Sequence, residues 1–188
     1  MKVSIGAKTL VFPTPVLIVG TYDGEQRPNA MAVAWGGICC SQPPCVSVSL
    51  RKATYSYGSI VARQAFTVNI PSEDQVGQAD YFGIASGRDE DKFEKTGLSP
   101  VASRLVDAPY IAEFPFVLEC RLLHTVEIGL HTAFIGEILD IKAEEAVLGE
   151  DGVPVMEKVK PIAYEPLNRR YFALGRYLAP AHKVGREI

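Results

Sequence analysis

An alternating strand pattern, NAMAVAW, covers residues 29–35 of the 188-residue chain. Successive side chains of a strand point to opposite faces. One face therefore carries Ala30, Ala32 and Ala34, and the other carries Asn29, Met31, Val33 and Trp35. A planar heterocycle could lie along such a strand and hydrogen-bond the main chain and Asn29. The alternative is a core strand with a half-buried Trp35.

Further short strand patterns, separated by glycine, proline, asparagine and aspartate, predict the fold class. They cover residues 16–22, 45–50, 65–70, 116–125 and 131–142. Helical signals are few: Thr54 or Ser56 caps a helix to about Arg63, and a capping box of Ser72 and Gln75 precedes a helix to about Phe82. Because strands do not alternate regularly with helices, we expect a mainly β, closed or split antiparallel barrel.

The remaining segments are more polar or more aromatic than the strands. Residues 86–100 are polar and indicate a surface excursion, and the chain beyond Pro161 is an aromatic, basic tail. We expect a single domain over residues 1–188, with the barrel core at about 13–142 and a C-terminal arm at about 161–188. The arm packs either on its own barrel or against a second copy.

Composition excludes several classes of protein. Hydrophobic residues make up 47 % of the chain and charged residues 22 %, which are globular values and exclude a mainly disordered chain. The net charge of -3 disfavours general nucleic-acid binding. No apolar run approaches the roughly 18 to 20 residues of a membrane span, and the first residues are too polar for a secretory signal. We therefore expect a soluble cytoplasmic protein with no nucleic-acid or membrane partner.

The usual motifs of metal and nucleotide chemistry are missing from the sequence. It contains no GxGxxG, GxxxxGK[ST], HExxH or GxSxG, and the histidines lack metal-ligand spacing, so no metal site is expected. The four cysteines, Cys39, Cys40, Cys45 and Cys120, form no CxxC pair. We interpret them as buried or half-buried thiols, with a redox role for Cys39 and Cys40 as the alternative.

The clearest binding signal is the sequence SLRKATYS at residues 49–56. A strand ends in cations, and hydroxyl residues follow where a helix begins. A helix N-terminus offers free N–H groups and a partial positive charge, and arginine and serine donors beside it suit a phosphate. The residues concerned are Ser49, Leu50, Arg51, Tyr55 and Ser56. The alternative is an ordinary helix cap beside solvated cations.

Two further residues are ambiguous when taken alone. Lys92 is a single cation in an acidic stretch, and most such lysines are solvated. His131 follows the Gly129-Leu130 turn at the start of a strand, where a surface or hydrogen-bonded histidine is the simpler interpretation.

Taken in order, these segments resemble the flavin reductase-like family of FMN-binding split barrels, and most closely its flavoredoxin branch. The resemblance covers most of residues 13–142, and the ordered set is specific although each stretch is short. The matching stretches are PTPV at 13–16, RPNAMAVAW at 27–35, VSVSLR at 46–51, VNIP at 68–71, DKF at 91–93, LEC at 118–120, GLHT at 129–132 and FIGEI at 134–138.

The resemblance implies a Greek-key split barrel that forms a homodimer, with one FMN per subunit near the interface. Carried over by position, the isoalloxazine would lie beside Asn29, Ala30, Met31, Ala32, Val33 and Trp35, and Ser49, Leu50 and Arg51 would continue that wall. Ser56, next to Tyr55, would hold the phosphate, Lys92 would add charge, and Asn69, His131 and Tyr164 would lie around the flavin. Ser56 stands where relatives often have threonine, and Cys39-Cys40 is no mark of the family.

The leading functional hypothesis is an FMN-dependent oxidoreductase that takes electrons from NAD(P)H or from a redox partner protein. The cofactor does the electron chemistry, so no side chain need be a nucleophile or general base, although His131 could donate a hydrogen bond to the flavin or to the donor. The alternatives are a flavoredoxin-type electron carrier without its own substrate and a non-enzymatic binding module on the same barrel.

Overall fold

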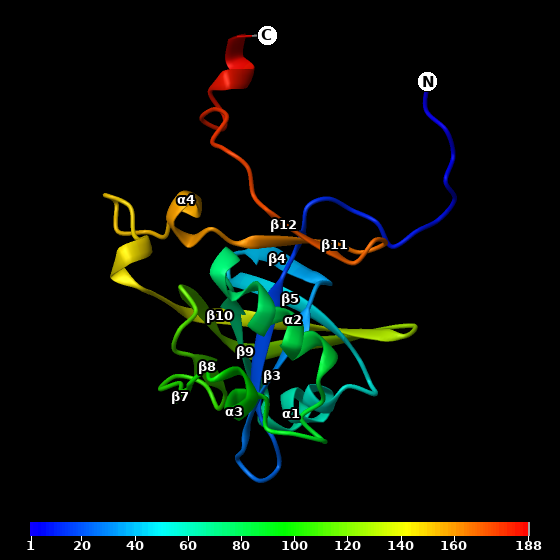
Figure 1. Ribbon diagram of the computed structural model, residues 1–188, viewed down its shortest axis with the longest axis vertical. Helices are drawn as coiled ribbons and strands as arrows, with labels where there is room; N and C mark the ends of the chain where they lie inside the picture. Colours follow the sequence, from blue (N-terminus) through cyan, green and yellow to red (C-terminus); the bar gives the residue numbers. More distant parts are fainter. Residues whose placement is uncertain (188) are drawn as a thin grey trace.

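The computed structural model describes residues 1–187, and a seven-stranded antiparallel sheet forms its centre (Figure 1). The strands follow the order β3-β2-β6-β9-β10-β5-β4. In chain order they are β2 (Leu17–Tyr22), β3 (Pro28–Val33), β4 (Gly36–Ser41), β5 (Pro44–Arg51), β6 (Ala65–Ile70), β9 (Phe116–Ile128) and β10 (His131–Ala143). Every neighbouring pair is antiparallel, which confirms the predicted fold class.

Smaller elements surround this sheet. A second sheet has the order β1-β11-β12, and its strands are β1 (Thr14–Pro15), β11 (Ile162–Glu165) and β12 (Arg170–Ala173). A third sheet pairs β7 (Pro100–Ala102) with β8 (Pro109–Ile111). The α-helices are α1 (Tyr55–Arg63), α2 (Val76–Ile84), α3 (Lys92–Thr96) and α4 (Met156–Val159), with 3-10 turns at Glu73–Gln75, Glu145–Val147 and Val184–Glu187. Within residues 1–187, no helix has the length and apolar character needed to cross a membrane.

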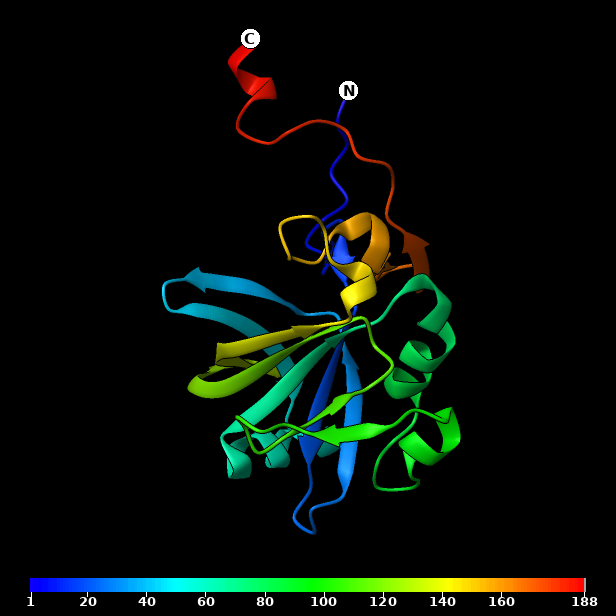
Figure 2. The same ribbon diagram turned by 90° about the vertical axis from the view of Figure 1, so that its left-hand side faces the viewer.

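The large sheet curls until the chain just past β3 meets β5. β3 lies at one end of the strand order and β5 lies next to the other end. The Ser49 N–H on β5 nevertheless donates to the carbonyl of Trp35, just past β3, at 2.8 Å. The β4–β5 hairpin then diverges from the rest of the sheet (Figure 2), so the barrel is split rather than fully closed.

Alternating side chains fill the interior of this barrel. Val46, Val48 and Leu50 point inward from β5, as their spacing predicts, and all three are buried. They pack with Phe66 of β6 and Phe134 of β10, whose exposed fractions are close to zero. Burial of this apolar surface is the main favourable term in the folding free energy.

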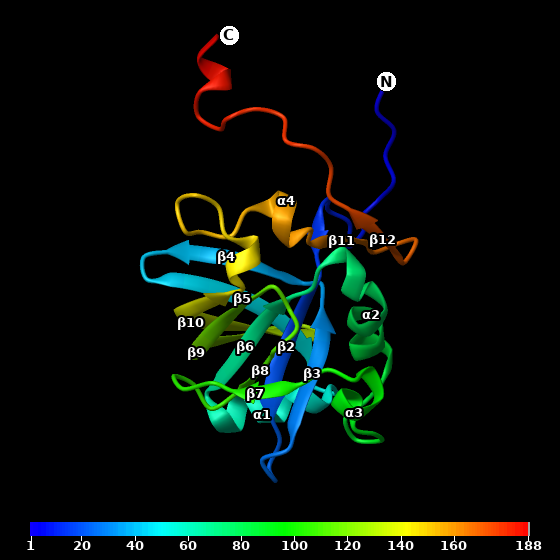
Figure 3. The ribbon, with the colours of Figure 1, turned by 60° about the vertical axis from the view of Figure 1, so that its left-hand side comes forward.

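A second core lies on the outer face of β2 and β3, where helices α2 and α3 cover the sheet (Figure 3). Ala30 packs there against apolar residues of both helices. A Cβ built on Gly83 of α2 would lie only 3.3 Å from the Cβ of Ala32. The alanine face of β3 therefore admits a close neighbour, and that neighbour is a helix. β3 is a core strand and Trp35 is half-buried, as the alternative interpretation of residues 29–35 predicts.

Several sequence predictions need correction. Residues 86–100 are not simply a surface excursion, because Lys92 and Phe93 of α3 are buried. β4 was not predicted, since its residues do not alternate in polarity and most are exposed. The tail beyond Pro161 contributes two paired strands, β11 and β12. Helix α1 begins after Thr54 as expected, but neither predicted cap, Thr54 or Ser56, bonds its end: the Thr54 hydroxyl donates to the Arg51 carbonyl at 2.9 Å.

The cysteines divide into two groups. Cys45 and Cys120 are buried, as predicted, whereas Cys39 and Cys40 are exposed on β4, which the sequence interpretation had wrong. Both exposed cysteines lie on the outermost strand of the sheet, in the hairpin that projects from the barrel (Figure 2).

Gly136 of β10 offers a test of the inner core. A Cβ there would lie 2.5 Å from Cζ of Phe66 and 3.0 Å from Cβ of Cys120. We expect Gly136→Ala to lower the free energy of unfolding by about 1–3 kcal/mol through overpacking. Gly58→Ala is the control, because Gly58 lies inside helix α1 with open space around it. It should raise stability by about 0.5–1 kcal/mol. Urea denaturation measures both, and an unchanged midpoint for Gly136→Ala would contradict the packing described.

Candidate functional site

Two pockets lie at opposite ends of strand β3. The first, which we call the basic pocket, has a volume of about 200 Å³ and is bordered by Pro28 and Asn29 at the start of the strand. The second, the aromatic pocket, has a volume of about 280 Å³ and is bordered by residues 32–34 at its end. Residues 29–34 of an extended chain span roughly 17 Å, so the pockets could receive the two ends of one elongated ligand.

The basic pocket combines three cations with several carboxylates. Its wall is formed by Asp23, Arg27, Pro28, Asn29, Tyr55 and residues 87–92. Three of its four acids already have partners. Asp23 accepts hydrogen bonds from Arg27 and Tyr55, Glu90 accepts one from Tyr81 (2.6 Å), and Asp91 caps helix α3 by accepting from the N–H groups of Phe93 and Glu94. These contacts leave Arg88 and Lys92 as cations that can take an anion.

Lys92 is the most unusual residue of this pocket. Its side chain is only 4 % exposed, and its Nζ reaches the carbonyl oxygens of Phe82 and Ala85 at 3.5 and 3.4 Å. Burial lowers the pKa of Lys92 to about 8, although nearby Glu90 opposes this. Among residues 1–186, no carboxylate lies within ion-pair distance of it. A buried cation without a counter-ion is costly, so this position suits a bound anion.

Asn29 and Ser56 form a buried hydrogen bond behind the basic pocket. Nδ2 of Asn29 donates to Oγ of Ser56 at 2.9 Å, and Ser56 in the first turn of α1 is fully buried. Gly87 passes so close to Asn29 that any Cβ would overlap the Asn29 amide oxygen. Arg88 then lies over the Tyr55 ring, 5.6 Å from its centre, and donates to the Ala53 carbonyl. The loop after α2 is thereby held against the start of α1.

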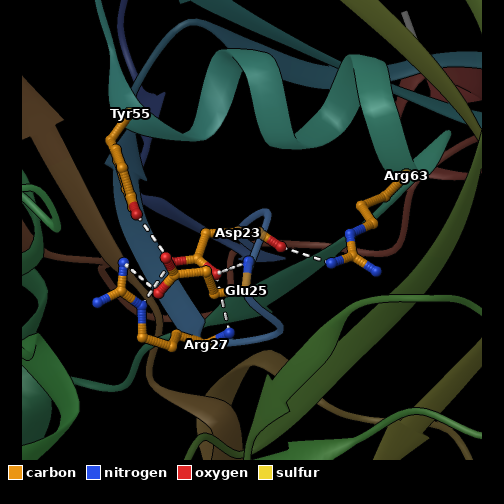
Figure 4. Close-up of polar contacts among 5 residues, drawn as sticks. All are labelled: Asp23, Glu25, Arg27, Tyr55 and Arg63. Carbon is orange, nitrogen blue, oxygen red and sulfur yellow. Dashed lines mark hydrogen bonds and ion pairs between the residues drawn. The ribbon is translucent and has the colours of Figure 1, made fainter.

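Asp23 organises the other wall of the basic pocket (Figure 4). Its Oδ1 accepts hydrogen bonds from the N–H groups of Glu25 (2.8 Å) and Arg27 (2.9 Å). Its Oδ2 accepts from Nε of Arg27 and from the hydroxyl of Tyr55, both at 2.8 Å. The Asp23 carbonyl accepts from Arg63 at the end of α1. This network fixes the β2–β3 turn to both ends of helix α1 and orients Tyr55.

The pKa of Asp23 reflects a competition between burial and hydrogen bonding. Burial alone would raise the pKa of this carboxyl. The Arg27 N–H, the Tyr55 hydroxyl, the Glu25 N–H and the Arg27 side chain outweigh burial and lower the pKa to about 2. Asp23 is therefore charged throughout the physiological range and stabilises the folded state through these four donors.

The aromatic pocket has a different chemical character. Ala32, Val33 and Ala34 border it from β3, while Tyr164 and Tyr171 border it from β11 and β12. The two tyrosine rings lie 5.5 Å apart between centres, and the Tyr171 hydroxyl donates to Oδ1 of Asp80 at 2.9 Å. Burial, followed by Asp80, raises the pKa of Tyr171. Small side chains facing tyrosine rings form a slot that suits a flat ring.

The structure brings together six of the fifteen candidate site residues at these two pockets. Asn29, Tyr55 and Lys92 border the basic pocket, and Ala32, Val33 and Tyr164 border the aromatic pocket. The side chains of Ala30, Met31, Leu50, Ser56 and Asn69 lie in or against the buried cores, and Trp35, Ser49, Arg51 and His131 border neither pocket.

Asn69 shows how a predicted site residue is used for folding. Its Nδ2 donates to the Ile18 carbonyl (2.9 Å) and to Oγ1 of Thr67 (3.0 Å), and its Oδ1 accepts from the Ile111 N–H (2.8 Å). The bonds to Ile18 and Ile111 join β6 to β2 and β8, and the bond to Thr67 lies within β6. The side chain is fully buried and its amide holds strands together.

Arg51 and His131 are opposite each other on β5 and β10, away from both pockets within one chain. Arg51 is exposed and His131 is half-buried. Sequence reasoning missed Asp23, Arg27 and Arg88 as residues of the site. Among residues 1–187, no group of three His, Cys, Asp or Glu side chains is placed to hold a metal ion.

Residues 9–174 match the model of the flavin reductase like domain, so the chain belongs to that family. It is 55 % identical to the flavoredoxin of Desulfovibrio vulgaris (Miyazaki F), with a TM-score of 0.95 over 98 % of this chain and 100 % of that one. The flavoredoxin of Methanosarcina acetivorans is 30 % identical, with a TM-score of 0.91 over 100 % and 98 % of the two chains. These similarities assign the chain to the flavoredoxin branch.

A third similarity is to an uncharacterized protein of Archaeoglobus fulgidus. It is 34 % identical over 131 residues, which are 70 % of this chain and 73 % of that protein. The family resemblance and the split-barrel fold are therefore confirmed independently of the site residues.

The Asp23 network predicts a pH-dependent contribution to stability. The folded pKa of about 2 lies below the usual 3.8, so the contribution is fully present above about pH 4 and is lost as the pH falls through about 2. The shift corresponds to about 2 kcal/mol. Asp23→Asn should therefore be less stable than the parent by about that amount at pH 7, and the difference should shrink between pH 4 and 2. Denaturant unfolding at several pH values measures it.

Asp74→Asn is the matched control, since Asp74 is exposed on the Glu73–Gln75 turn. Its effect should be small and nearly independent of pH. A constant stability difference for Asp23→Asn from pH 7 to pH 2 would refute the role assigned to the carboxylate.

Proposed function

We propose that this protein binds FMN and acts as an FMN-dependent oxidoreductase, with electrons entering from NAD(P)H or from a redox partner protein. The observation that supports it best is the buried Lys92 ammonium beside the basic pocket, with no carboxylate of residues 1–186 in ion-pair contact. The family match over residues 9–174 supports a flavin as the ligand and a single domain as the unit that binds it.

The residues present fit the two ends of FMN. Lys92 and Arg88 would hold the phosphate, since charge-assisted hydrogen bonds to phosphate contribute about 1.5–3 kcal/mol each. Ala32, Ala34 and Tyr164 would border the isoalloxazine. Asn29 borders the basic pocket and leads along β3 toward the aromatic pocket. FMN, when bound, would supply the electron chemistry by accepting a hydride or single electrons and passing them on.

The chain's own contribution would be binding, orientation and the exclusion of water. The Asp23 network keeps Tyr55 and Arg27 in place at one pocket, and the Tyr171–Asp80 hydrogen bond fixes the aromatic wall of the other. No side chain is assigned as a nucleophile or general base. His131 is proposed as a hydrogen-bond donor to the flavin or to the electron donor. Because it borders neither pocket of its own chain, this role requires that His131 approach the ligand from another direction.

A homodimer is part of this proposal. Val126, Ile128 and Leu130 are exposed apolar residues at the tip of the β9–β10 hairpin, and His131 follows them directly. Exposed apolar side chains clustered on one hairpin support an interface with a second copy. In a dimer built on this hairpin, His131 and the neighbouring Arg51 would lie at the interface.

A flavoredoxin-type electron carrier without its own substrate is the second candidate. It is favoured by the 55 % identity and near-complete overlap with the Desulfovibrio vulgaris protein, whose name is flavoredoxin. Both candidates use the same FMN site, and they differ in whether NAD(P)H reduces the flavin directly.

Lys92 provides the test of the binding site. Lys92→Met should weaken FMN binding roughly 10- to 100-fold at pH 7, which follows from the loss of one charge-assisted hydrogen bond. Wild-type affinity should also fall above about pH 8, because Lys92 loses its proton there, whereas the affinity of Lys92→Met should be less sensitive to pH. Fluorescence titration of the apoprotein with FMN measures both effects.

Lys95→Met is the control, because Lys95 is exposed on the same helix. It should bind FMN as the parent does. Equal affinities for Lys92→Met and Lys95→Met would remove Lys92 from the site. A protein that is colourless as purified and stays colourless with added FMN would overturn the proposal and favour the non-enzymatic module.

Anaerobic reduction separates the two candidates. The oxidoreductase predicts rapid bleaching of the flavin absorbance when NADH or NADPH is mixed with the holoprotein in a stopped-flow instrument. Bleaching that occurs only after a reduced partner protein is added would favour the carrier. Light scattering on the same holoprotein should give the mass of a dimer, and a monomer with FMN bound would contradict the interface proposed for the β9–β10 hairpin.

A further inference from the structure

Three of the four cysteines lie on one hairpin at the edge of the large sheet. Cys39 and Cys40 are on β4, and Cys45 is on β5. β4 is an edge strand whose only partner in the sheet is β5, and the hairpin projects from the side of the barrel (Figure 2). None of these cysteines borders the basic or the aromatic pocket, so the proposed function does not use them.

The strand register pairs two of these cysteines directly. Cys40 and Cys45 are opposite each other across β4 and β5. Directly opposed residues of antiparallel strands have Cα atoms about 4.5 or 5.5 Å apart and side chains on the same face. A disulfide spans Cα separations of about 4.4 to 6.8 Å. The hairpin therefore needs no change of register to form a Cys40–Cys45 bond.

Cys39 lacks this geometry although it adjoins Cys40 in sequence. The register passes from Ile38 opposite Val46 to Cys40 opposite Cys45, with an irregularity between them. Cys39 occupies that irregularity and has no opposed residue on β5. It therefore provides a natural comparison for Cys40: both are exposed, but only Cys40 is paired with Cys45 in the strand register.

The thiols of the pair differ in environment. Cys40 is exposed, whereas Cys45 is 3 % exposed. Sγ of Cys40 donates to the Gln42 carbonyl and Sγ of Cys45 to the Pro43 carbonyl, each at 3.4 Å, so both thiols are directed toward the loop that joins the strands. Burial, and then the charges of the neighbouring groups Cys40, Cys39 and Glu137, raise the pKa of Cys45. An exposed thiol beside a buried one suits a stepwise reaction in which the exposed thiol reacts first.

We propose that Cys40 and Cys45 form a reversible thiol–disulfide pair that is oxidised by low-molecular-weight disulfides. The Cys40 thiolate attacks one sulfur of the disulfide RSSR, which forms Cys40–S–S–R and releases one thiolate RS⁻. Cys45 then loses its proton and attacks Sγ of Cys40, which forms the Cys40–Cys45 bond and releases the second RS⁻. The two cysteines lose two protons and two electrons, and RSSR is reduced to two RSH.

The position of the pair defines what the bond would do. It closes a loop of only six residues, so it restricts the unfolded chain less than a disulfide across a long loop would. Its larger effect would be to hold β4 in register with β5, since β4 is the outermost strand of the sheet. The pair is thus a redox-responsive modification site rather than a structural disulfide.

The experiment exposes the reduced holoprotein to oxidised glutathione, then denatures it, alkylates the remaining thiols and determines masses. In the parent, alkylatable thiols should fall from four to two without a retained glutathione, and dithiothreitol should restore all four. Cys39→Ser should lose two thiols in the same way. Cys40→Ser should form no internal disulfide, and Cys45→Ala should retain glutathione on Cys40.

The variants at exposed positions keep the test independent of folding. Cys39 and Cys40 are exposed, so replacing either with serine leaves the core intact, whereas replacement of buried Cys45 can disturb it. The proposal fails if Cys39→Ser keeps all its thiols under conditions that oxidise the parent. It also fails if Cys40→Ser closes an internal disulfide as readily as Cys39→Ser does. Neither outcome depends on FMN binding, so failure of the thiol–disulfide proposal can be distinguished from failure of the proposed function.

Discussion

Burial of strand β3 on both of its faces is the constraint on which the remaining structure depends. Met31 and Val33 pack toward the interior of the barrel, while Ala30 and Ala32 pack toward helix α2. Larger residues on the alanine face would push the helix away, since Gly83 already approaches Ala32 closely. Both pockets are bordered by this strand, so its fixed position sets the distance between them.

The positive charge of the basic pocket depends on the same packing. The chain carries a net charge of -3, yet Lys92 at the start of α3 is buried where no acid among residues 1–186 pairs with it. Three of the four acids of the same pocket are held by other donors, as Asp23 is by Arg27 and Tyr55. A local cationic site therefore exists within an acidic protein, because the neighbouring carboxylates accept hydrogen bonds from other groups and do not pair with Lys92.

The sequence predicted the fold better than the site, and particular residues show why. Alternation predicted the inward face of Val46, Val48 and Leu50, because strand burial follows a period of two. It did not predict that Lys92 is buried, because this depends on the contact of α3 with α2 rather than on any local pattern. Asn69 matched a site position of the family, yet its amide bonds strands, a role that only the three-dimensional register reveals.

The proposed site also separates two tasks between different parts of the chain. Residues of the basic pocket, such as Lys92 and Arg88, would set the affinity for FMN. They would not affect which electron donor is used, because they would contact only the phosphate end. The choice of donor would depend on what surrounds the other end, where Asp80, Arg169 and Tyr171 border the aromatic pocket. A reductase and a carrier can therefore share one phosphate site and one fold. Because Asp80 is already bonded to Tyr171, Arg169 is the charged residue at that end best placed to meet an anionic donor.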